Sequence, residues 1–337
     1  MGIFVEAYRN LIDIIIEKDT LYCCCSAMNE ILCSLHNYTK FSGYSSSFYH
    51  MAQAGLDCGL DAVISTDKNV YPSGRDQFYY LSGKRLLVIC GEELFDPLSP
   101  EAPHYLSVGI GREQFNRKTG DPQDEIRVML RDQGENNRFR HLELVNAEDF
   151  LMRDILYSQK VLRERVNDYD ALLRSELRFL ILAGTCSAEH TEKYTYRELF
   201  STACNHILSD EPLNGDLVHD KLLTLQCLKS GRLYIALDGL ADAKGFSFTA
   251  EGDNQESIAF PGDMIYLRSS ITLKIKNPEP CTCRLIRNGT VIREWQHCKQ
   301  IPFTIYEPGN YRVESSLTIR RDLYNWIFSN PIFVVKG

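Results

Sequence analysis

Two short stretches of the chain carry side chains of the types that bind metal ions. His36 stands in "SLHNYTKFSG" (34–43), and Asp67 stands in "VISTDKNVYPSG" (63–74). Imidazole nitrogens and carboxylate oxygens are ligands of zinc and similar divalent ions. Each stretch looks like a metal-binding signature in which other ligands have been replaced. The chain therefore has an active metallohydrolase site, a smaller site, or the remains of one.

A metal centre needs elements that bring distant residues together, and the first 240 residues alternate between strand-like and helix-like segments. Short, continuously apolar runs are typical of buried strands, and apolar residues at helical spacing behind a Ser cap predict a helix over 45–60. Strands that alternate with helices indicate an α/β domain with its site at the carboxyl ends of the strands. We expect strands at 61–66, 84–93, 103–111, 140–146, 177–185 and 232–237, and further helices at 147–175, 194–208 and 216–231.

The pattern changes near residue 245, where short strands separated by turn residues begin. "SSITLKIKN" (269–277) alternates apolar and polar residues, and Asn288-Gly289 between two apolar runs is a strong hairpin signal. These features predict a small Ig-like β-sandwich. Near the start of the chain, apolar residues recur at helical spacing from Phe4 to Ile15 and predict an amphipathic helix. The expected division is an N-terminal helix (1–25), an α/β domain (26–243) and a β-sandwich (244–337).

Composition limits the classes of function. The net charge of −8 and the pI near 5.6 argue against binding of nucleic acid, which calls for a basic face. No stretch approaches the roughly 18 uncharged apolar residues of a spanning helix, so no membrane span is expected. The twelve cysteines, without an export signal, are expected to be reduced thiols of a cytoplasmic protein. Cys281, Cys283 and Cys298 lack a fourth ligand nearby, and His206 and His219 lie in predicted helices without partner spacing.

Taken in order, the short motifs resemble those of the PHP (polymerase and histidinol phosphatase) superfamily, in the subgroup with a C-terminal β-sandwich. "SLHNYTKFS" stands where that family has Asp-Leu-His-x-His-Thr, and "STDKN" where it has Thr-Asp-His-Asn. "GEE" places the family's glutamate at Glu93, and His104 matches a histidine near the next strand. "GTCSAEH" (184–190) stands at the family's Gly-(Ser/Thr)-Asp-Ala-His. The resemblance implies a distorted seven-stranded β/α barrel.

The departures from the family pattern concern its metal ligands. In the family, a cluster of His, Asp and Glu holds two or three zinc, manganese or iron ions that hydrolyse phosphate esters. Here Tyr38 and Lys68 stand at two of the histidine positions, and Cys186 stands at an aspartate position. An ammonium group at a metal position adds positive charge, and Coulomb repulsion opposes a cation there. The family's Ala-His-Pro motif is not found between His104 and residue 140. Ligand types survive at His36, Asp67, Glu93 and His104, so a multinuclear site is not expected.

Three interpretations of these residues remain open. In the first, no cofactor is bound, and the residues form a hydrogen-bonded polar remnant in which Lys68 pairs with Asp67 or Glu93. In the second, one divalent metal (Zn or Mn) is held by His36, Glu93 and Cys186, with His104 reaching a neighbouring position. In the third, Lys68 binds a phosphate-bearing small molecule at a metal-free pocket; Arg75 and Tyr38 are the further candidates for that pocket.

We expect a catalytically impaired PHP-like protein that acts as a binding or structural subunit, with other protein subunits as partners. The alternatives are a metal-dependent phosphoesterase with a reduced metal site and a metal-free sensor of phosphate or nucleotides. The basis for this choice is that hallmark positions are altered in every metal motif, whereas the strand cores and the β-sandwich pattern are intact.

Overall fold

The computed structural model describes residues 28–94, 96, 98, 104–109, 126–130, 141–152, 155–174, 178–185, 193–253 and 257–337. The predicted N-terminal helix and Cys186 lie outside the described residues. Within those ranges, none of the helices has both the length and the apolar character needed to cross a membrane.

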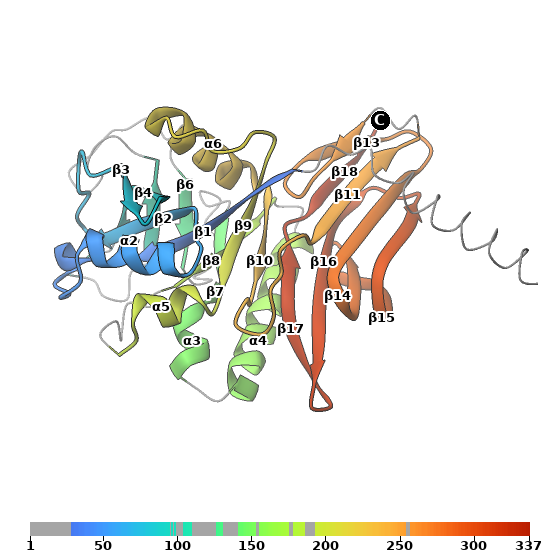
Figure 1. The fold of residues 1–337 in the computed structure, drawn as a ribbon. Helices are drawn as coiled ribbons and strands as arrows, with labels where there is room; N and C mark the ends of the chain where they lie inside the picture. Colours follow the sequence, from blue (N-terminus) through green and yellow to red (C-terminus); the bar gives the residue numbers. More distant parts are fainter. Residues whose placement is uncertain are drawn as a thin grey trace, which may run out of the picture.

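The chain forms a mixed α/β structure that consists mostly of sheet (Figure 1). The first part contains β1 (Asn29–Asn37), η1 (Lys40–Ser42), α2 (Phe48–Asp57), β2 (Ala62–Lys68), β3 (Gln77–Leu81), β4 (Lys84–Leu94), β5 (Tyr105–Val108), β6 (Ile126–Met129), β7 (His141–Asn146), α3 (Ala147–Met152), α4 (Ile155–Arg174), β8 (Leu180–Gly184), α5 (Tyr196–Phe200), β9 (Cys204–Ser209), α6 (Leu217–Ser230) and β10 (Leu233–Ala236). The second part contains β11 (Ser247–Gly252), β12 (Ile258–Ala259), β13 (Met264–Leu267), β14 (Ile271–Arg287), β15 (Thr290–Ile305), β16 (Gly309–Ile319), β17 (Asp322–Ser329) and β18 (Ile332–Lys336).

Strand β1 is central to the first part because it pairs with three other strands. It runs parallel to β2, antiparallel to β9, and meets the parallel strand β8 at the register pair Leu35 and Gly184. Beyond β2, parallel β4 follows, then antiparallel β5 and β6, and parallel β7 connects to β8. Parallel strands with continuous apolar runs agree with the sequence pattern, but β5 makes this part of the sheet mixed.

Two asparagine side chains complete the hydrogen bonding of β8 on the edge where no described strand pairs with Ile181 or Ala183. Asn205 accepts from the Ala183 N–H at 2.8 Å and donates to the Ala183 carbonyl at 2.8 Å. Asn330 does the same for Ile181, at 2.7 and 3.1 Å. An amide side chain carries one acceptor and two donors, so it reproduces the pairing that a neighbouring backbone would supply. Buried backbone groups need such partners.

Several elements form where local sequence signals place them. Helix α2 begins after Ser47, whose hydroxyl accepts from the backbone of His50, and it buries the expected apolar face. Helix α6 ends at Gly231, which has a left-handed backbone with φ of 77°. The hairpin between β14 and β15 turns at Asn288 and Gly289, both with positive φ, as a two-residue type I′ loop requires.

The predicted helix over 194–208 is wrong in its second half. Helix α5 ends at Phe200, and β9 begins at Cys204. The hydroxyls of Ser201 and Thr202 each donate to the carbonyl four residues earlier, at 2.8 Å. These bonds satisfy carbonyls in the last turn of the helix. Every residue of β9 is buried, and a short apolar run with both faces buried reads equally well as helix or strand.

Strand β10 lies between the two parts and contributes one face to each hydrophobic core (Figure 1). Leu233 and Ile235 belong to the first core, and Tyr234 and Ala236 belong to the second. β10 pairs antiparallel with β9 on one side and with β17 on the other, so sheet hydrogen bonding continues from the first part into the second. The alternation of side chains along a strand therefore lets four residues serve two cores.

Candidate functional site

The surviving ligand-type residues gather near the ends of strands of the first part. His36 lies near the end of β1, Lys68 ends β2, Glu93 lies near the end of β4, and His104 immediately precedes β5. Glu143, in the middle of β7, joins them. His36, Glu93 and Glu143 are buried, whereas the His104 side chain is 26% exposed. The positive φ of 65° at His36, uncommon outside glycine, turns the strand at this point.

A chain of hydrogen bonds joins these side chains. His36 Nδ1 lies 2.6 Å from Glu143 Oε2, and His36 Nε2 lies 2.9 Å from the Tyr38 hydroxyl. The Tyr38 hydroxyl donates to Glu93 Oε2, and His104 Nδ1 lies 3.2 Å from Glu93 Oε1. Because Tyr38 donates to Glu93, its oxygen is available to accept from His36. The imidazole of His36 therefore donates from both of its nitrogens.

The position of Glu143 is fixed by its surroundings. The Asn146 amide donates to Glu143 Oε1 at 2.9 Å. Gly184 leaves room on the other side, since a Cβ at that position would lie 2.0 Å from Glu143 Oε2. The absence of a side chain at Gly184 thus allows the carboxylate to reach His36.

Tyr38 is held on three sides. Its ring stacks on Tyr44 with centroids 5.6 Å apart, and Tyr196 donates to its backbone carbonyl. Lys68 Nζ lies 4.9 Å from the centroid of the Tyr38 ring, in cation–π geometry. Lys68 is also the register partner of Glu93 in the pairing of β2 with β4. The ammonium group therefore lies beside the hydrogen-bonded chain.

Asp67 does not join the chain, although it is adjacent to Lys68. Its carboxylate accepts from the Thr39 N–H at 2.7 Å, from the Thr39 hydroxyl at 2.8 Å and from the Ser42 hydroxyl at 2.7 Å. These contacts fix the turn around η1. The expectation that Asp67 shares a site with His36 is not supported by its contacts, which point to a structural role.

The other two expected site residues lie apart or beyond the described ranges. Arg75 is exposed in the loop between β2 and β3, and among the described residues its side chain makes no hydrogen bond or ion pair to the chain around His36. Cys186 lies outside the described residues. Lys68 lies over the Tyr38 ring and is the register partner of Glu93; its pairing with Asp67 or Glu93 stays a prediction.

The charges within the chain shift the pKa values of its members. Burial alone favours neutral imidazole, but the Glu143 carboxylate outweighs it and raises the pKa of His36. Burial alone likewise favours protonated Glu93, but the bond from His104 and the charge of His36 lower its pKa. Burial raises the pKa of Asp67, and the bonds from Ser42 and Thr39 offset this only in part. His36 therefore favours the charged form, in agreement with its two donated bonds.

The described residues do not fit a metal ion at this position. A metal needs a lone pair on a His36 nitrogen. The bond from Nδ1 to Glu143 is common in metal-binding histidines, but Nε2 lies against the Tyr38 hydroxyl. The Tyr38 hydroxyl lies between His36 and Glu93, whose Nε2 and Oε2 atoms are 4.0 Å apart. In the described ranges, no three His, Cys, Asp or Glu side chains are grouped to hold a metal. The side chains of this arrangement bind one another through hydrogen bonds and opposite charges.

Sequence reasoning missed Glu143 and Asn146, and it placed Tyr38 without a partner. The available signal was an acidic residue in the centre of the apolar run "HLELVN", because a carboxylate inside a buried strand needs a partner. No motif pointed to Tyr44 or Tyr196, which are brought to Tyr38 from other elements.

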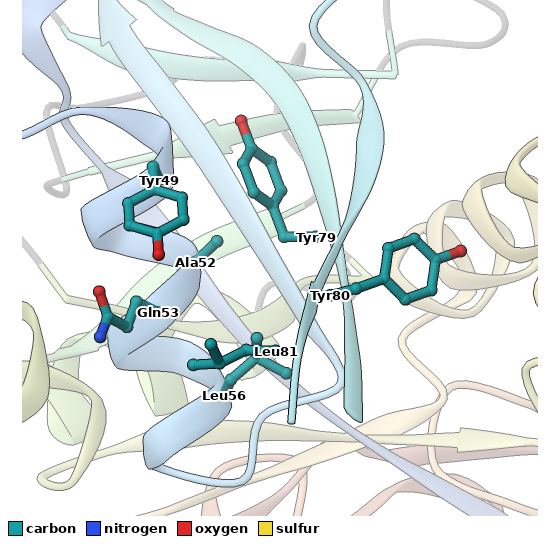
Figure 2. A pocket seen from close by; sticks show the side chains of 7 residues that line it. All are labelled: Tyr49, Ala52, Gln53, Leu56, Tyr79, Tyr80 and Leu81. Atoms are coloured by element: carbon teal, nitrogen blue, oxygen red, sulfur yellow. The ribbon is translucent and has the colours of Figure 1, made fainter. Parts of the chain in front are cut away.

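A shallow apolar depression lies elsewhere, between α2 and β3 (Figure 2). It encloses about 10 Å³, enough for roughly one water molecule. None of the side chains of the His36 chain lines it. Its lining consists of Tyr49, Ala52, Gln53, Leu56, Tyr79, Tyr80 and Leu81.

Comparisons with known proteins give a distant likeness in structure. No family model matches the chain, and no curated protein matches its sequence. Among solved structures, the chain is similar to the crystal structure of a two-domain protein containing a predicted PHP-like metal-dependent phosphoesterase from Bacteroides vulgatus. The TM-score is 0.42 and the sequence identity 12%, over 90% of this chain and 96% of that one.

Proposed function

We propose that this chain is a catalytically impaired PHP-like protein that binds no metal at the position around His36 and acts as a binding or structural subunit. The observation that carries the proposal is the Tyr38 hydroxyl, which bridges His36 and Glu93. In the resembled family, a histidine stands at the position of Tyr38 and would present a lone pair to a metal. A phenol that donates a hydrogen bond closes that position instead.

Electrostatics support the same conclusion. A divalent cation normally neutralises the carboxylates around it. Here the protonated His36 lies against Glu143, and Lys68 and His104 lie near Glu93. Lys68 and the protonated His36 thus supply positive charge beside Glu93, in the place of a metal charge.

The proposal includes a finer fold assignment. We infer that β1, β2, β4, β5, β6, β7 and β8 form the distorted seven-stranded barrel of the PHP type, and that the part from residue 244 onward is an Ig-like sandwich. The support is that each of these seven strands pairs with the next, while β8 also pairs with β1. A cytoplasmic location rests on the cysteine-rich composition.

Elemental analysis of protein purified without chelators tests the metal-free site. We expect less than a tenth of an equivalent of zinc, manganese or iron, and no hydrolysis of phosphate esters. The double substitution Tyr38→His with Lys68→His should raise metal uptake at least tenfold, because it restores two imidazoles and removes the ammonium. Tyr44→His is the matched control, since Tyr44 contacts the Tyr38 ring but does not lie between His36 and Glu93. One bound equivalent together with turnover in the unmodified protein would overturn the proposal.

The subunit role is tested by the native mass of the protein in extracts of its own source. We expect it to migrate well above the 38.7 kDa of a single chain, with a defined stoichiometry that purified components reproduce. His36→Ala should leave that assembly unchanged, because the chain around His36 is buried. Migration as a free monomer at every concentration would contradict the subunit role.

A further inference from the structure

The long hairpin of β14 and β15 bends where β14 changes its second partner. Residues 271–276 of β14 pair with β11, whereas residues 282–287 pair with β16. β15 follows β14 along its whole length, but the register between them is interrupted between Lys276 and Cys281 and again between Cys281 and Cys283. On β15, His297 has a positive φ of 55°, which is typical of a bulge. This bend, residues 277–281 with 296–300, is called the hairpin corner below.

Two cysteines lie opposite each other at the hairpin corner. Cys281 of β14 and Cys298 of β15 are register partners. Directly opposed residues of antiparallel strands have Cα atoms about 4.5–5.5 Å apart, with side chains on the same face of the sheet. That separation is within the roughly 4.4–6.8 Å that a disulfide spans. Both thiols are reduced in the structure, and both contact the second core.

The surroundings give the two thiols different access. Cys281 is 4% exposed, and Cys298 is partly exposed at the outer strand of the hairpin. Cys298 donates to the Gln296 carbonyl at 3.3 Å. Cys283, two residues further on β14, is fully buried and faces Trp295 rather than a thiol. A reagent in solution therefore reaches Cys298 first.

We propose that Cys281 and Cys298 are a redox modification site. The two thiols form a reversible disulfide with each other, and the oxidant is a small-molecule disulfide of the glutathione class. The Cys298 thiolate attacks the oxidant, forms a mixed disulfide and releases one thiol. The Cys281 thiolate then attacks Cys298 Sγ and releases the second thiol. Two protein thiols are oxidised and one small disulfide is reduced to two thiols, so atoms and electrons balance.

Burial makes the second step slow at neutral pH. It raises the pKa of Cys281 to about 11, so only a small fraction is thiolate at pH 7. The step should accelerate nearly tenfold for each unit of pH between 7 and 9, in proportion to that fraction. Once formed, the bond joins the two strands at the hairpin corner, where the regular ladder is interrupted, and restrains the angle between the two halves of β14.

The test treats the full chain with oxidised glutathione and identifies the linked peptides by mass spectrometry. We expect two peptides linked through Cys281 and Cys298, with a mass two hydrogens below the sum of the two reduced peptides. Dithiothreitol should separate them. Cys298→Ser should abolish this pair. Cys283→Ser is the matched control and should retain it, because Cys283 lies on the same strand face without an opposing thiol.

A second measurement separates the site from loss of folding. Hydrogen exchange of residues 277–281 and 296–300 should slow at least threefold on oxidation in the unmodified protein and in Cys283→Ser, but not in Cys298→Ser. A stable glutathione adduct on Cys298 with Cys281 still reduced would overturn the proposal. So would an equal yield of linked peptides among unrelated cysteines, which indicates unfolding rather than a preformed pair.

Discussion

The structure contains two buried histidines with nearly the same set of partners. One lies at the candidate site, and the other lies on β9, at the junction of the two cores. His36 lies between Glu143 and Tyr38, and Tyr38 continues to Glu93. His206 on β9 lies between Glu30 at 2.6 Å and Asp238 at 3.0 Å. Its ring stacks on Tyr234 with centroids 4.5 Å apart. Tyr234 in turn donates to Glu30, as Tyr38 does to Glu93.

The two regions differ in place and in exposure. Both carboxylates around His36 are nearly fully buried, whereas Glu30 and Asp238 are 21% and 23% exposed. No motif of the chain marks His206 as functional. The same combination of histidine, carboxylates and tyrosine therefore occurs a second time, where it joins β1, β9 and β10. The comparison leads us to interpret both chains of hydrogen bonds as stabilising the fold, and the variants below test this.

The largest expected effect is that of His206→Ala on stability. Removing the cation leaves Glu30 and Asp238 facing each other with only neutral donors at the junction of the two cores. Breaking such a pair typically costs about 3–5 kcal/mol, and the partial exposure of the carboxylates favours the lower end. Urea unfolding should show this as a decrease in the midpoint. The control substitution His219→Ala, at a more exposed position, should cost clearly less. Equal effects would contradict the role given to His206.

The dependence of stability on pH should reveal the contribution of His206. Burial opposes its charge, but the bonds to Asp238 and Glu30 prevail and raise its pKa to about 9 in the folded protein. An unfolded histidine titrates near 6.5. The stabilisation is therefore complete below pH 6.5 and is lost as the pH rises through 9, by about 3 kcal/mol in total. Urea midpoints measured from pH 6 to 10 should show this loss of stability in the unmodified protein. The variant His206→Gln should lack it. An unchanged slope in that variant would show that other groups carry it.

His36→Ala should destabilise the protein by about 2 kcal/mol, somewhat less than His206→Ala. Hydrogen bonds to charged groups contribute roughly 1.5–3 kcal/mol each, but Glu143 keeps Asn146 and Glu93 keeps His104 as partners. Thermal or urea unfolding measures this cost. If His36 instead belonged to an active centre, its removal would leave stability unchanged or raised and would abolish turnover. That result would break the comparison between the two regions.

The smallest expected effects are those of the two tyrosine hydroxyls. Tyr38→Phe removes a hydroxyl that donates to Glu93 and accepts from His36. Tyr234→Phe removes a single O–H that is shared between Glu30 and the Ala243 carbonyl. Each lost bond costs about 1 kcal/mol, so Tyr38→Phe should cost somewhat more. Parallel urea titrations of both variants measure the difference. A gain of bound metal in Tyr38→Phe without loss of stability would show that the hydroxyl blocks a site rather than completes a network.

Much of the local structure follows from short patterns in the sequence. The Ser cap and apolar spacing predicted α2, Gly231 predicted the end of α6, and Asn288-Gly289 predicted the hairpin of β14 and β15. Continuous apolar runs predicted β2, β4, β7 and β8. These signals are reliable because each depends on neighbours within about ten residues. The error at β9 came from the same dependence, since its burial is set by two cores that no local window contains.

The candidate site was predicted only in part. His36, Glu93, His104 and Lys68 are close together as expected, and Tyr38 lies among them. Glu143 was missed, Arg75 lies apart, and Asp67 serves the turn at η1 instead. A motif gives the type of a residue but not the direction of its side chain. The direction is set by the positive φ at His36 and by the register of β2 against β4.

By itself the sequence determined which residue types stand at the motif positions, and so that a tyrosine and a lysine replace two ligands of the resembled family. It also determined where most helices, strands and turns form, because capping, periodicity and turn chemistry are local. Only the tertiary structure decided that the Tyr38 hydroxyl closes the gap between His36 and Glu93, and that Glu143 supplies the opposing charge. The reason is that hydrogen-bond partners and pKa values depend on strand register and burial, which join residues that lie more than a hundred positions apart in the chain.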